Sequence, residues 1–206
     1  DIYVGSDPAW LAPIRRQRFI TVRDLPVTPG KVCVWCGSPC AGRRTRWCST
    51  ACSDEYAIRA SGSAARWRVE RRDRGVCARC GRDTERLRRA IDRMLRAWPV
   101  RGRVPGWDQA VAVRHRLVGA LVRLGYPPMY WTQQHYTGHL WEADHVIPVV
   151  EGGGCCGLDG LRTLCIPCHR RETAALAGRR ATGPFPRPRH AVGRYTRTDE
   201  RGLPDP

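Results

Sequence analysis

Eight of the eleven cysteines in this 206-residue chain fall into four closely spaced pairs. The pairs are Cys33-x2-Cys36, Cys48-x3-Cys52, Cys77-x2-Cys80 and Cys165-x2-Cys168. Two such pairs that converge supply four thiolates in the tetrahedral arrangement of a structural zinc site. The spacing therefore predicts two zinc ions, one bound by the first two pairs and one bound by the last two.

The cellular compartment favours metal ligands over disulfides. The chain has no apolar run of the roughly 20 residues that span a membrane, and it opens without a signal segment. We expect an intracellular protein without membrane contact, where cysteines stay reduced. Cys40 is an alternative ligand for the first zinc, but Cys48 and Cys52 fit the start of a helix better. Cys155 and Cys156 are expected to pack in the interior rather than form a redox pair.

The charge balance predicts a polyanionic partner. Lysine and arginine total 36 against 19 acidic residues, a net charge of +17, and Lys31 is the only lysine. Arginine binds phosphate through a forked, bidentate geometry, so nucleic acid is the first expectation. A GC-rich genome would explain the preference for arginine over lysine but not the net charge. The arginine-rich stretch 66–74 is expected to contact the DNA backbone.

Four segments follow along the chain. Residues 1–32 are expected to be an arm that becomes ordered on contact, and residues 33–75 a four-cysteine zinc module whose polar helix breaks near Ser61 and ends at Gly75. Residues 76–177 form a second zinc unit. The tail 178–206 carries seven arginines against three acidic residues without apolar periodicity, so we expect disorder there.

The second unit contains a helical insertion at about residues 83–125. Two amphipathic helices are predicted, ending at Pro99 and at Gly125. Their inward faces are expected to be Leu87, Ala90, Ile91, Met94, Leu95 and Trp98 in the first, and Val111, Leu117, Val118, Leu121 and Val122 in the second. The second zinc site would therefore close a loop of more than eighty residues.

Short strands and a last helix follow the insertion. Residues 140–142 and 146–150 read as strands, and three glycines at 152–154 allow a tight turn. Pro167 suits the first turn of a helix. The predicted fold class is α+β, with strands and a helix assembled around the second zinc site.

Three residues near this zinc site have the chemistry of phosphodiester hydrolysis. Asp144 and His145 adjoin a predicted strand, and His169 directly follows the zinc ligand Cys168. Hydrolysis needs a base that activates water and a cation that holds the phosphate. An aspartate and a histidine can hold one divalent ion, and a neighbouring histidine with a pKa near 6.5 is a suitable base.

These residues resemble a known family. The run Trp141-Glu142-Ala143-Asp144-His145-Val146-Ile147-Pro148, the glycines at 152–154, and the run Leu158-Asp159-Gly160-Leu161-Arg162-Thr163-Leu164-Cys165-Ile166-Pro167-Cys168-His169 are similar to HNH endonucleases of the ββα-metal (His-Me finger) fold. More narrowly, they resemble the zinc-stabilised C-terminal HNH domain of zinc-finger annealing helicases. The resemblance spans roughly residues 33–177.

The resemblance implies a role for each matching residue. Asp144 and His169 would bind a catalytic Mg²⁺ or Mn²⁺, and His145 would be the general base. The zinc at Cys77, Cys80, Cys165 and Cys168 would be structural. Arginines near the site would contact phosphate, namely Arg162, Arg170 and Arg171.

One position departs from the family pattern. The middle asparagine of the motif falls on Gly160, which has no side chain to orient the base or contribute to the metal site. Asp159 could substitute as a ligand, or a backbone carbonyl could hold the ring of His145. The alternative is that activity is weakened or lost.

Three functions therefore remain open. The first is a divalent-metal-dependent DNA endonuclease, with branched or flapped DNA as plausible a substrate as plain duplex. The second is a catalytically degenerate DNA-binding module. The third is a zinc-built adaptor whose insertion docks a protein, such as a larger helicase or a defence-system subunit.

Overall fold

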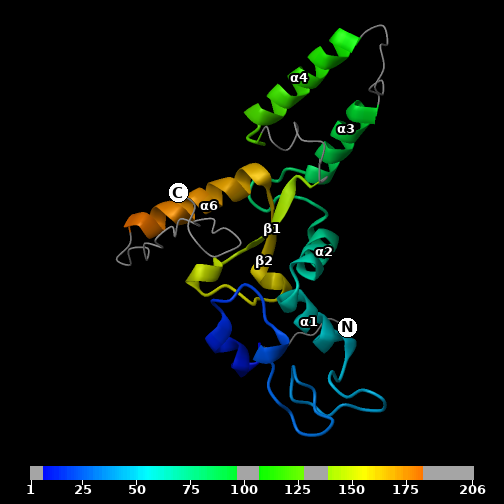
Figure 1. The fold of residues 1–206 in the computed structure, drawn as a ribbon, viewed down its shortest axis with the longest axis vertical. Coiled ribbons are helices and arrows are strands. Elements are labelled where there is room, and N and C mark those ends of the chain that lie inside the picture. Colours follow the sequence, from blue (N-terminus) through cyan, green and yellow to red (C-terminus); the bar gives the residue numbers. More distant parts are fainter. Residues whose placement is uncertain (1–6, 97–106, 128–138, 183–206) are drawn as a thin grey trace, which may run out of the picture. The chain divides into compact units, whose positions relative to one another are not determined.

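The computed structural model describes residues 7–96, 107–127 and 139–182 (Figure 1). Residues up to Arg170 belong to one compact unit, and a second begins at Arg171. None of the helices in these described ranges combines the length and the apolar character that a bilayer crossing requires.

Two consecutive helices begin at the first group of cysteines, whose last member, Cys52, lies in the first helix. Helix α1 spans Thr50–Ala60 and α2 spans Gly62–Asp73. The predicted break lies at Ser61, whose Oγ accepts a hydrogen bond from the Ala64 amide and so caps α2. Gly75 directly follows the C-cap of α2 and has φ +73°, a left-handed conformation that suits glycine.

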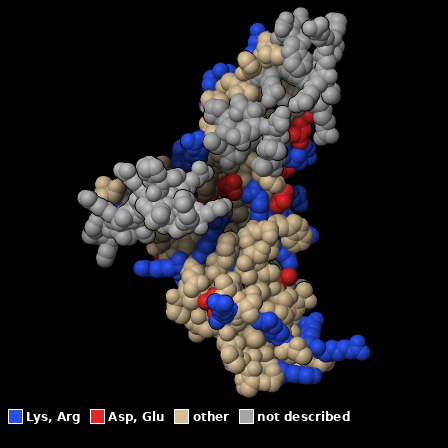
Figure 2. Space-filling model, viewed as in Figure 1, with Lys and Arg blue, Asp and Glu red and all other residues tan. Residues whose placement is uncertain are grey.

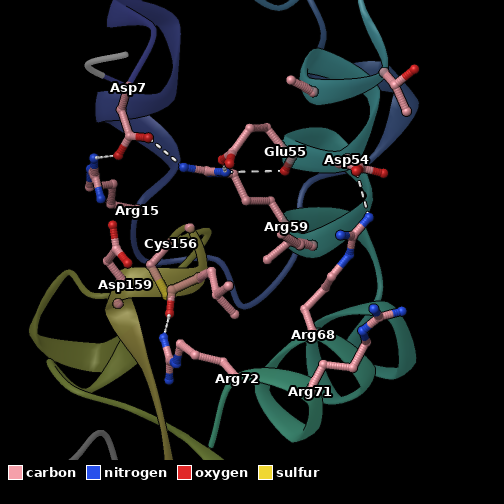
Figure 3. Close-up of a pocket in the computed structure, with 16 residues that line it drawn as sticks. Asp7, Arg15, Asp54, Glu55, Arg59, Arg68, Arg71, Arg72, Cys156 and Asp159 are labelled. Carbon is pink, nitrogen blue, oxygen red and sulfur yellow. Dashed lines mark hydrogen bonds and ion pairs between the residues drawn. The ribbon is translucent and has the colours of Figure 1, made fainter. Parts of the chain in front are cut away.

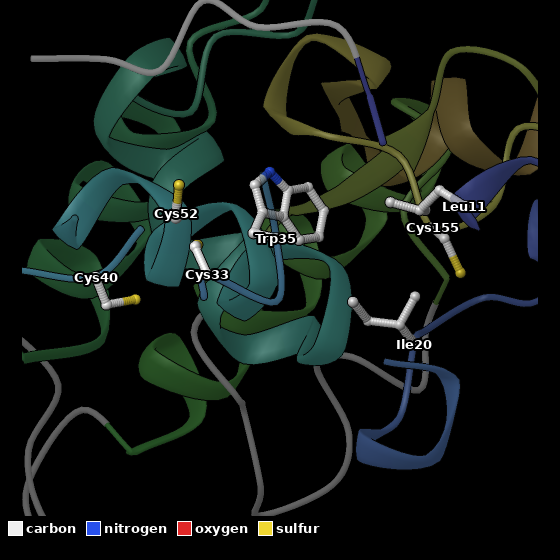
Figure 4. Packing of buried hydrophobic residues seen from close by; sticks show 7 residues of the cluster. All are labelled: Leu11, Ile20, Cys33, Trp35, Cys40, Cys52 and Cys155. Atoms are coloured by element: carbon white, nitrogen blue, oxygen red, sulfur yellow. The ribbon is translucent and has the colours of Figure 1, made fainter. Parts of the chain in front are cut away.

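The N-terminal arm packs against its own chain. Two short 3-10 helices, η1 at Ala9–Ile14 and η2 at Val22–Asp24, carry it across the first cysteine group. Figure 4 shows its side chains in a buried cluster that comprises Leu11, Ile20, Cys33, Trp35, Cys40, Cys52 and Cys155. The arm therefore joins the first cysteine group to the loop around Cys155.

Buried Arg59 ties the same region together through polar contacts. Only 4% of its surface is exposed, and it forms ion pairs with Asp7 of the arm and Glu55 of α1. Its guanidinium lies 4.8 Å from the ring centroid of Trp35. A buried charge needs such partners to offset its lost hydration.

The sheet has two antiparallel strands among the described residues. Strand β1 spans Trp141–His145 and β2 spans Leu161–Cys165, with the register running from Trp141 opposite Cys165 to His145 opposite Leu161. Helix α6, Ile166–Thr182, follows β2 without a loop. The molecule is a mixed helix and strand protein, as the sequence predicted.

The prediction of a strand at residues 146–150 was wrong. This segment contains the 3-10 helix η3 at Val149–Glu151, and the amides of Glu151 and Gly153 both donate to the Pro148 carbonyl. Its apolar residues point outward, with Val146 48% and Ile147 57% exposed. The true partner of β1 lies further along the chain, after the 3-10 helix η4 at Leu158–Gly160.

The insertion forms two helices, α3 at Thr84–Arg96 and α4 at Trp107–Arg123. They pack through a cluster that comprises Ile91, Leu121, Tyr126, Leu140 and Ile166, with Leu87, Leu117 and Val118 against it. Met94 and Val122 were predicted to face inward but are 43% and 39% exposed. The predicted helix end at Trp98 and Pro99 lies outside the described residues.

Helix α6 continues to Thr182, beyond Gly178, where the sequence predicted a disordered tail. Residues 179–182 remain helical, and the Thr182 hydroxyl donates to the Gly178 carbonyl one turn earlier. The rest of the predicted tail, residues 183–206, lies outside the described residues.

Candidate functional site

The structure gathers the cysteines into two groups of four. In each group the sulfurs lie within 4.8 Å of one another, and the groups are Cys33, Cys36, Cys48 and Cys52, and Cys77, Cys80, Cys165 and Cys168. The Sγ to Sγ distance is 3.4 Å for Cys36 and Cys48 and 3.7 Å for Cys80 and Cys165. Zinc with bonds of about 2.3 Å separates tetrahedral sulfurs by roughly 3.8 Å, so both groups can hold zinc.

The leading pair of each group has the same backbone turn. Cys33 and Cys77 each accept a hydrogen bond from a glycine amide four residues later, at 2.9 Å in both cases. These glycines, Gly37 and Gly81, have φ of +76° and +68°. The repeated motif Cys-x2-Cys-Gly therefore builds two equivalent knuckles, because only glycine adopts this conformation without strain.

Hydrogen bonds favour a thiolate in each knuckle. Although burial opposes the effect, contacts with Ser38 lower the pKa of Cys36 to about 6. Burial also raises the pKa of Cys77, but hydrogen bonds from the backbone amides of Cys165 and Cys80 outweigh it and lower this pKa to about 7. Zinc binds the thiolate form, which is favoured at Cys36 and Cys77, whereas burial raises the pKa of Cys52 and Cys165.

Asp144 and His169 come together beside the second cysteine group. His169 Nε2 lies 3.8 Å from Asp144 Oδ1. Arg162, directly opposite Asp144 in the sheet, donates from Nε and Nη2 to Asp144 Oδ2 at 3.0 and 2.9 Å. Two ligands about 2.1 Å from one ion lie roughly 3 to 4 Å apart, so this carboxylate and imidazole can share a divalent cation.

His145 leaves β1 on the other face of the strand, because successive side chains alternate. It lines a cavity of about 150 Å³ together with Arg18 and Phe19 of the arm and Ala65 of α2. Burial lowers the pKa of His145; Asp144 opposes this shift and Arg18 adds to it. The shift favours the neutral imidazole, the form that a general base requires.

Comparison with known proteins finds a family whose pattern these residues match. Residues 131–175, which include Asp144, His145 and His169, match the HNH endonuclease family. The resemblance to HNH endonucleases is confirmed. Over 140 residues the chain is 34% identical to a Mus musculus protein named DNA annealing helicase and endonuclease ZRANB3, 34% identical to the protein of that name from Bos taurus and 32% to that from Homo sapiens.

Each of these matches covers 66% of this chain and 12% of the relative's length, so the chain spans about an eighth of those proteins. No solved structure matches the chain. The comparison therefore concerns the HNH segment and its surroundings, and not the remainder of the relatives.

At the position where the HNH motif has asparagine, the Cys156 side chain occupies the space that an asparagine side chain would need. A Cβ added to Gly160 would lie 2.5 Å from Cys156 Cβ and 2.8 Å from its sulfur. The Gly160 carbonyl accepts a hydrogen bond from the Val146 amide at 2.8 Å. Asp159, the predicted substitute ligand, lines a different cavity from His145 (Figure 3).

Arginines around the HNH segment divide into structural and exposed ones. Arg66 Nη2 donates to the Trp141 carbonyl at 2.7 Å, and Arg72 donates to the carbonyls of Leu158 and Leu161. Arg170 and Arg171 are exposed on α6. Figure 2 shows many basic and few acidic side chains on the face in view. Only part of the arginine-rich stretch 66–74 is therefore available to a polyanion.

Two residues near His145 had no sequence signal. Arg18 and Phe19 lie in the arm, outside the HNH resemblance, yet both line the His145 cavity. The packing of Phe19 against Gly62, where a Cβ would meet its ring at 3.0 Å, places them there. Such a contact depends on the fold of the arm, which carries no motif.

Proposed function

We propose that this chain is a divalent-metal-dependent DNA endonuclease that hydrolyses phosphodiester bonds. The observation that carries the proposal is the approach of His169 Nε2 to Asp144 Oδ1, 3.8 Å apart, within a segment that matches the HNH endonuclease family. The relatives' name also contains the words DNA and endonuclease. We assign the chemistry to residues 76–177, organised as a ββα-metal unit, and DNA affinity to residues 33–75.

Asp144 and His169 are the proposed ligands of Mg²⁺ or Mn²⁺. Such an ion, when bound, supplies positive charge to the scissile phosphate and to the leaving oxygen. Arg162, which donates to Asp144, orients this carboxylate and lies beside the position of the phosphate. The zinc groups are proposed to have structural roles only.

His145 is the proposed general base. Its partly buried ring keeps a neutral imidazole, which takes a proton from water as the water attacks phosphorus. His145 is the last residue of β1. Groups on both faces of the strand, His145 on one and Asp144 on the other, therefore reach a phosphate placed at this end. Arg18 of the arm supplies a cation in the same cavity.

A cleavage assay tests the assignment. Supercoiled plasmid and a branched oligonucleotide are incubated with the zinc-loaded chain in Mg²⁺, in Mn²⁺ or without divalent ions. We expect cleavage that needs the added ion and falls about 100-fold or more in His145→Ala. His115→Ala, an exposed histidine on α4, is the matched control and should cleave normally. Equal cleavage by wild type and His145→Ala would refute the assignment.

A non-catalytic DNA-binding module is the second candidate. Gly160 favours it, because Cys156 fills the space where the asparagine side chain would begin. This function predicts DNA binding without cleavage in either metal. Gly160→Asn combined with Cys156→Gly makes room for the side chain, and a gain of cleavage only in this double variant would identify a degenerate site.

The relatives' name also contains the words annealing helicase. We propose a helicase as the partner of this segment, whether in the same polypeptide or separate. Co-purification of the chain with helicase domains tests this proposal independently of cleavage.

A further inference from the structure

The arm segment 15–20 is held between two parts of the molecule. On one side, the Gly154 amide donates to the Arg15 carbonyl at 2.7 Å. On the other side, the Ile20 amide donates to the Arg59 carbonyl of α1 at 3.0 Å. Figure 1 shows the arm, in blue, beside the yellow loop that joins β1 to β2. The arm is therefore docked on the loop that follows the proposed base, His145.

Glycine at position 154 makes this docking possible. A Cβ there would overlap the Gln17 carbonyl oxygen and would lie 2.6 Å from the Arg15 carbonyl oxygen. The next residue, Cys155, donates from its thiol to the Gln17 carbonyl at 3.2 Å. The sequence predicted only a tight turn at the three glycines 152–154. The last of these glycines also forms the surface on which the backbone of the arm lies.

The docked arm brings two side chains to His145. The ring of Phe19 lies on Gly62 of α2, where a Cβ would meet the ring at 3.0 Å. Arg18 Cζ lies 5.2 Å from the ring centroid of Phe19, and both residues line the cavity of about 150 Å³ that contains His145. At roughly 30 Å³ for each water molecule, this cavity has room for about five of them. It therefore fits one phosphate group but not a whole nucleotide.

The charges around this cavity leave one cation without an acidic partner. Three arginines line it, namely Arg18, Arg59 and Arg66. Arg66 pairs with Glu142 at 2.9 Å, and Arg59 pairs with two carboxylates, one in the arm and one in α1. Arg18 is exposed, and within the described ranges it forms no ion pair. An anion beside His145 therefore has a free guanidinium as its partner.

We propose that Arg18 is a phosphate-binding residue of the cleavage site, contributed by the arm and positioned by Gly154. It contacts the DNA phosphodiester from the His145 face of β1, whereas Asp144 and Arg162 lie on the opposite face. The guanidinium offers two parallel donors that match two phosphate oxygens. This inference rests on the proposed function and adds to it a residue outside the segment that matches the HNH family.

DNA binding without divalent ions tests the contact independently of cleavage. The zinc-loaded chain is titrated into a fluorescent DNA duplex at several salt concentrations, with anisotropy as the readout. Arg18→Gln should reduce the slope of log K against log salt by about 0.9, the value for one phosphate contact. Arg18→Lys keeps the charge and should keep the slope. Arg23→Gln, an exposed arginine in η2 of the same arm, is the matched control and should also leave the slope unchanged.

Cleavage kinetics separate a phosphate contact from a merely structural role. Loss of a charge-assisted hydrogen bond that already forms with bound substrate should raise KM about 10- to 150-fold in Arg18→Gln and leave kcat almost unchanged. A structural role predicts the opposite result, because a smaller folded fraction lowers kcat without raising KM. Arg18→Lys should recover part of the loss in KM.

Gly154→Ala tests the docking of the arm. The added methyl group displaces the backbone of residues 15–17, so this variant should show the same loss of slope as Arg18→Gln. Combining the two substitutions should cause no further loss, because both remove one contact. Gly178→Ala, where an added Cβ meets nothing within 4 Å, is the control. Zinc content and circular dichroism report folding, and if Gly154→Ala does not fold, the Arg18 variants decide.

Two results would overturn the proposal: an unchanged slope and KM in Arg18→Gln, or an equal loss of slope in Arg23→Gln. A folded Gly154→Ala variant that binds DNA normally would refute the role of the docking. The nuclease assignment fails differently. If wild type cleaves nothing but Arg18→Gln lowers the slope, the phosphate contact stands and the endonuclease is refuted. If His145→Ala abolishes cleavage while Arg18→Gln changes neither slope nor KM, the reverse holds.

Discussion

The two cysteine groups have equivalent knuckles but different roles in the chain. The first is local: Cys36 and Cys48, whose sulfurs are 3.4 Å apart, are 12 positions apart in sequence. The second is long-range: Cys80 and Cys165, at 3.7 Å, are 85 positions apart. Closing the longer loop costs roughly 2 kcal/mol more chain entropy, so a link there removes more freedom from the unfolded chain.

The two cysteine groups also differ in the amount of apolar packing around them, which is greater at the first group. The first group lies in an apolar cluster with Leu11, Ile20 and Trp35, which the arm completes. The cluster at the second group contains its own cysteines and Leu164. The first cysteine group therefore lies inside an apolar core, whereas the second is buried mainly among its own cysteines and Leu164.

Cys168→Ser should have the largest effect. We expect loss of one of two zinc ions and destabilisation by about 5 kcal/mol or more, because the knuckle at Cys77 is no longer joined to α6. Zinc content and thermal unfolding measure this. Cys40→Ala, a buried thiol outside both groups, is the control and should retain both ions.

Cys36→Ser should also lose one zinc but cost less, about 2 to 4 kcal/mol, because the core around Trp35 remains. The same unfolding experiment compares the two variants. Equal destabilisation by Cys36→Ser and Cys168→Ser would show that loop length and surroundings do not distinguish the two sites.

Asp73→Asn tests the polar contacts that support the second region. Asp73 ends α2 and accepts from Arg72 and from the Thr163 amide and hydroxyl, which ties α2 to β2. Losing charge-assisted bonds should cost about 1.5 to 3 kcal/mol. If the cost approaches that of Cys168→Ser, the second region depends on this carboxylate as much as on its metal.

The effect of Asp73→Asn should depend on pH. The hydrogen bond from Arg72, although opposed by burial, lowers the pKa of Asp73 below its ordinary value in the folded protein. The stabilisation is therefore present above the ordinary carboxyl pKa and is lost as pH falls through the lowered one. Wild type and Asp73→Asn should converge in acid.

Local signals predicted much of the fold. Each of these signals is close in sequence to the feature that it determines. They are the apolar periodicity at Leu87 and Ile91, the helix break at Ser61 and the helix stop at Gly75. The cysteine spacing predicted both groups. These features succeed because the energies that decide them act along the helix or within one turn.

Long-range pairing explains what the sequence did not predict. The apolar run 146–150 is a better strand former than residues 161–165, but β1 pairs with the latter because α6 and the second cysteine group hold them beside it. Asp144 and His169 were expected to meet. The hydrogen bonds from Arg162 to Asp144 depend on the register of the two strands. The position of Arg18 beside His145 depends on the fold of the arm, and no local pattern encodes either.

Gly160→Ala should have the smallest effect of the four variants, about 1 to 2 kcal/mol, from overpacking against Cys156. Chemical denaturation measures it, and combination with Cys156→Gly should recover part of the loss. Gly178→Ala, at a helical position where an added Cβ meets nothing within 4 Å, should instead be neutral or stabilising. If Gly160→Ala is equally harmless, the loop before β2 can shift to accommodate a methyl group. The second region is then held by its metal site rather than by close packing around that loop.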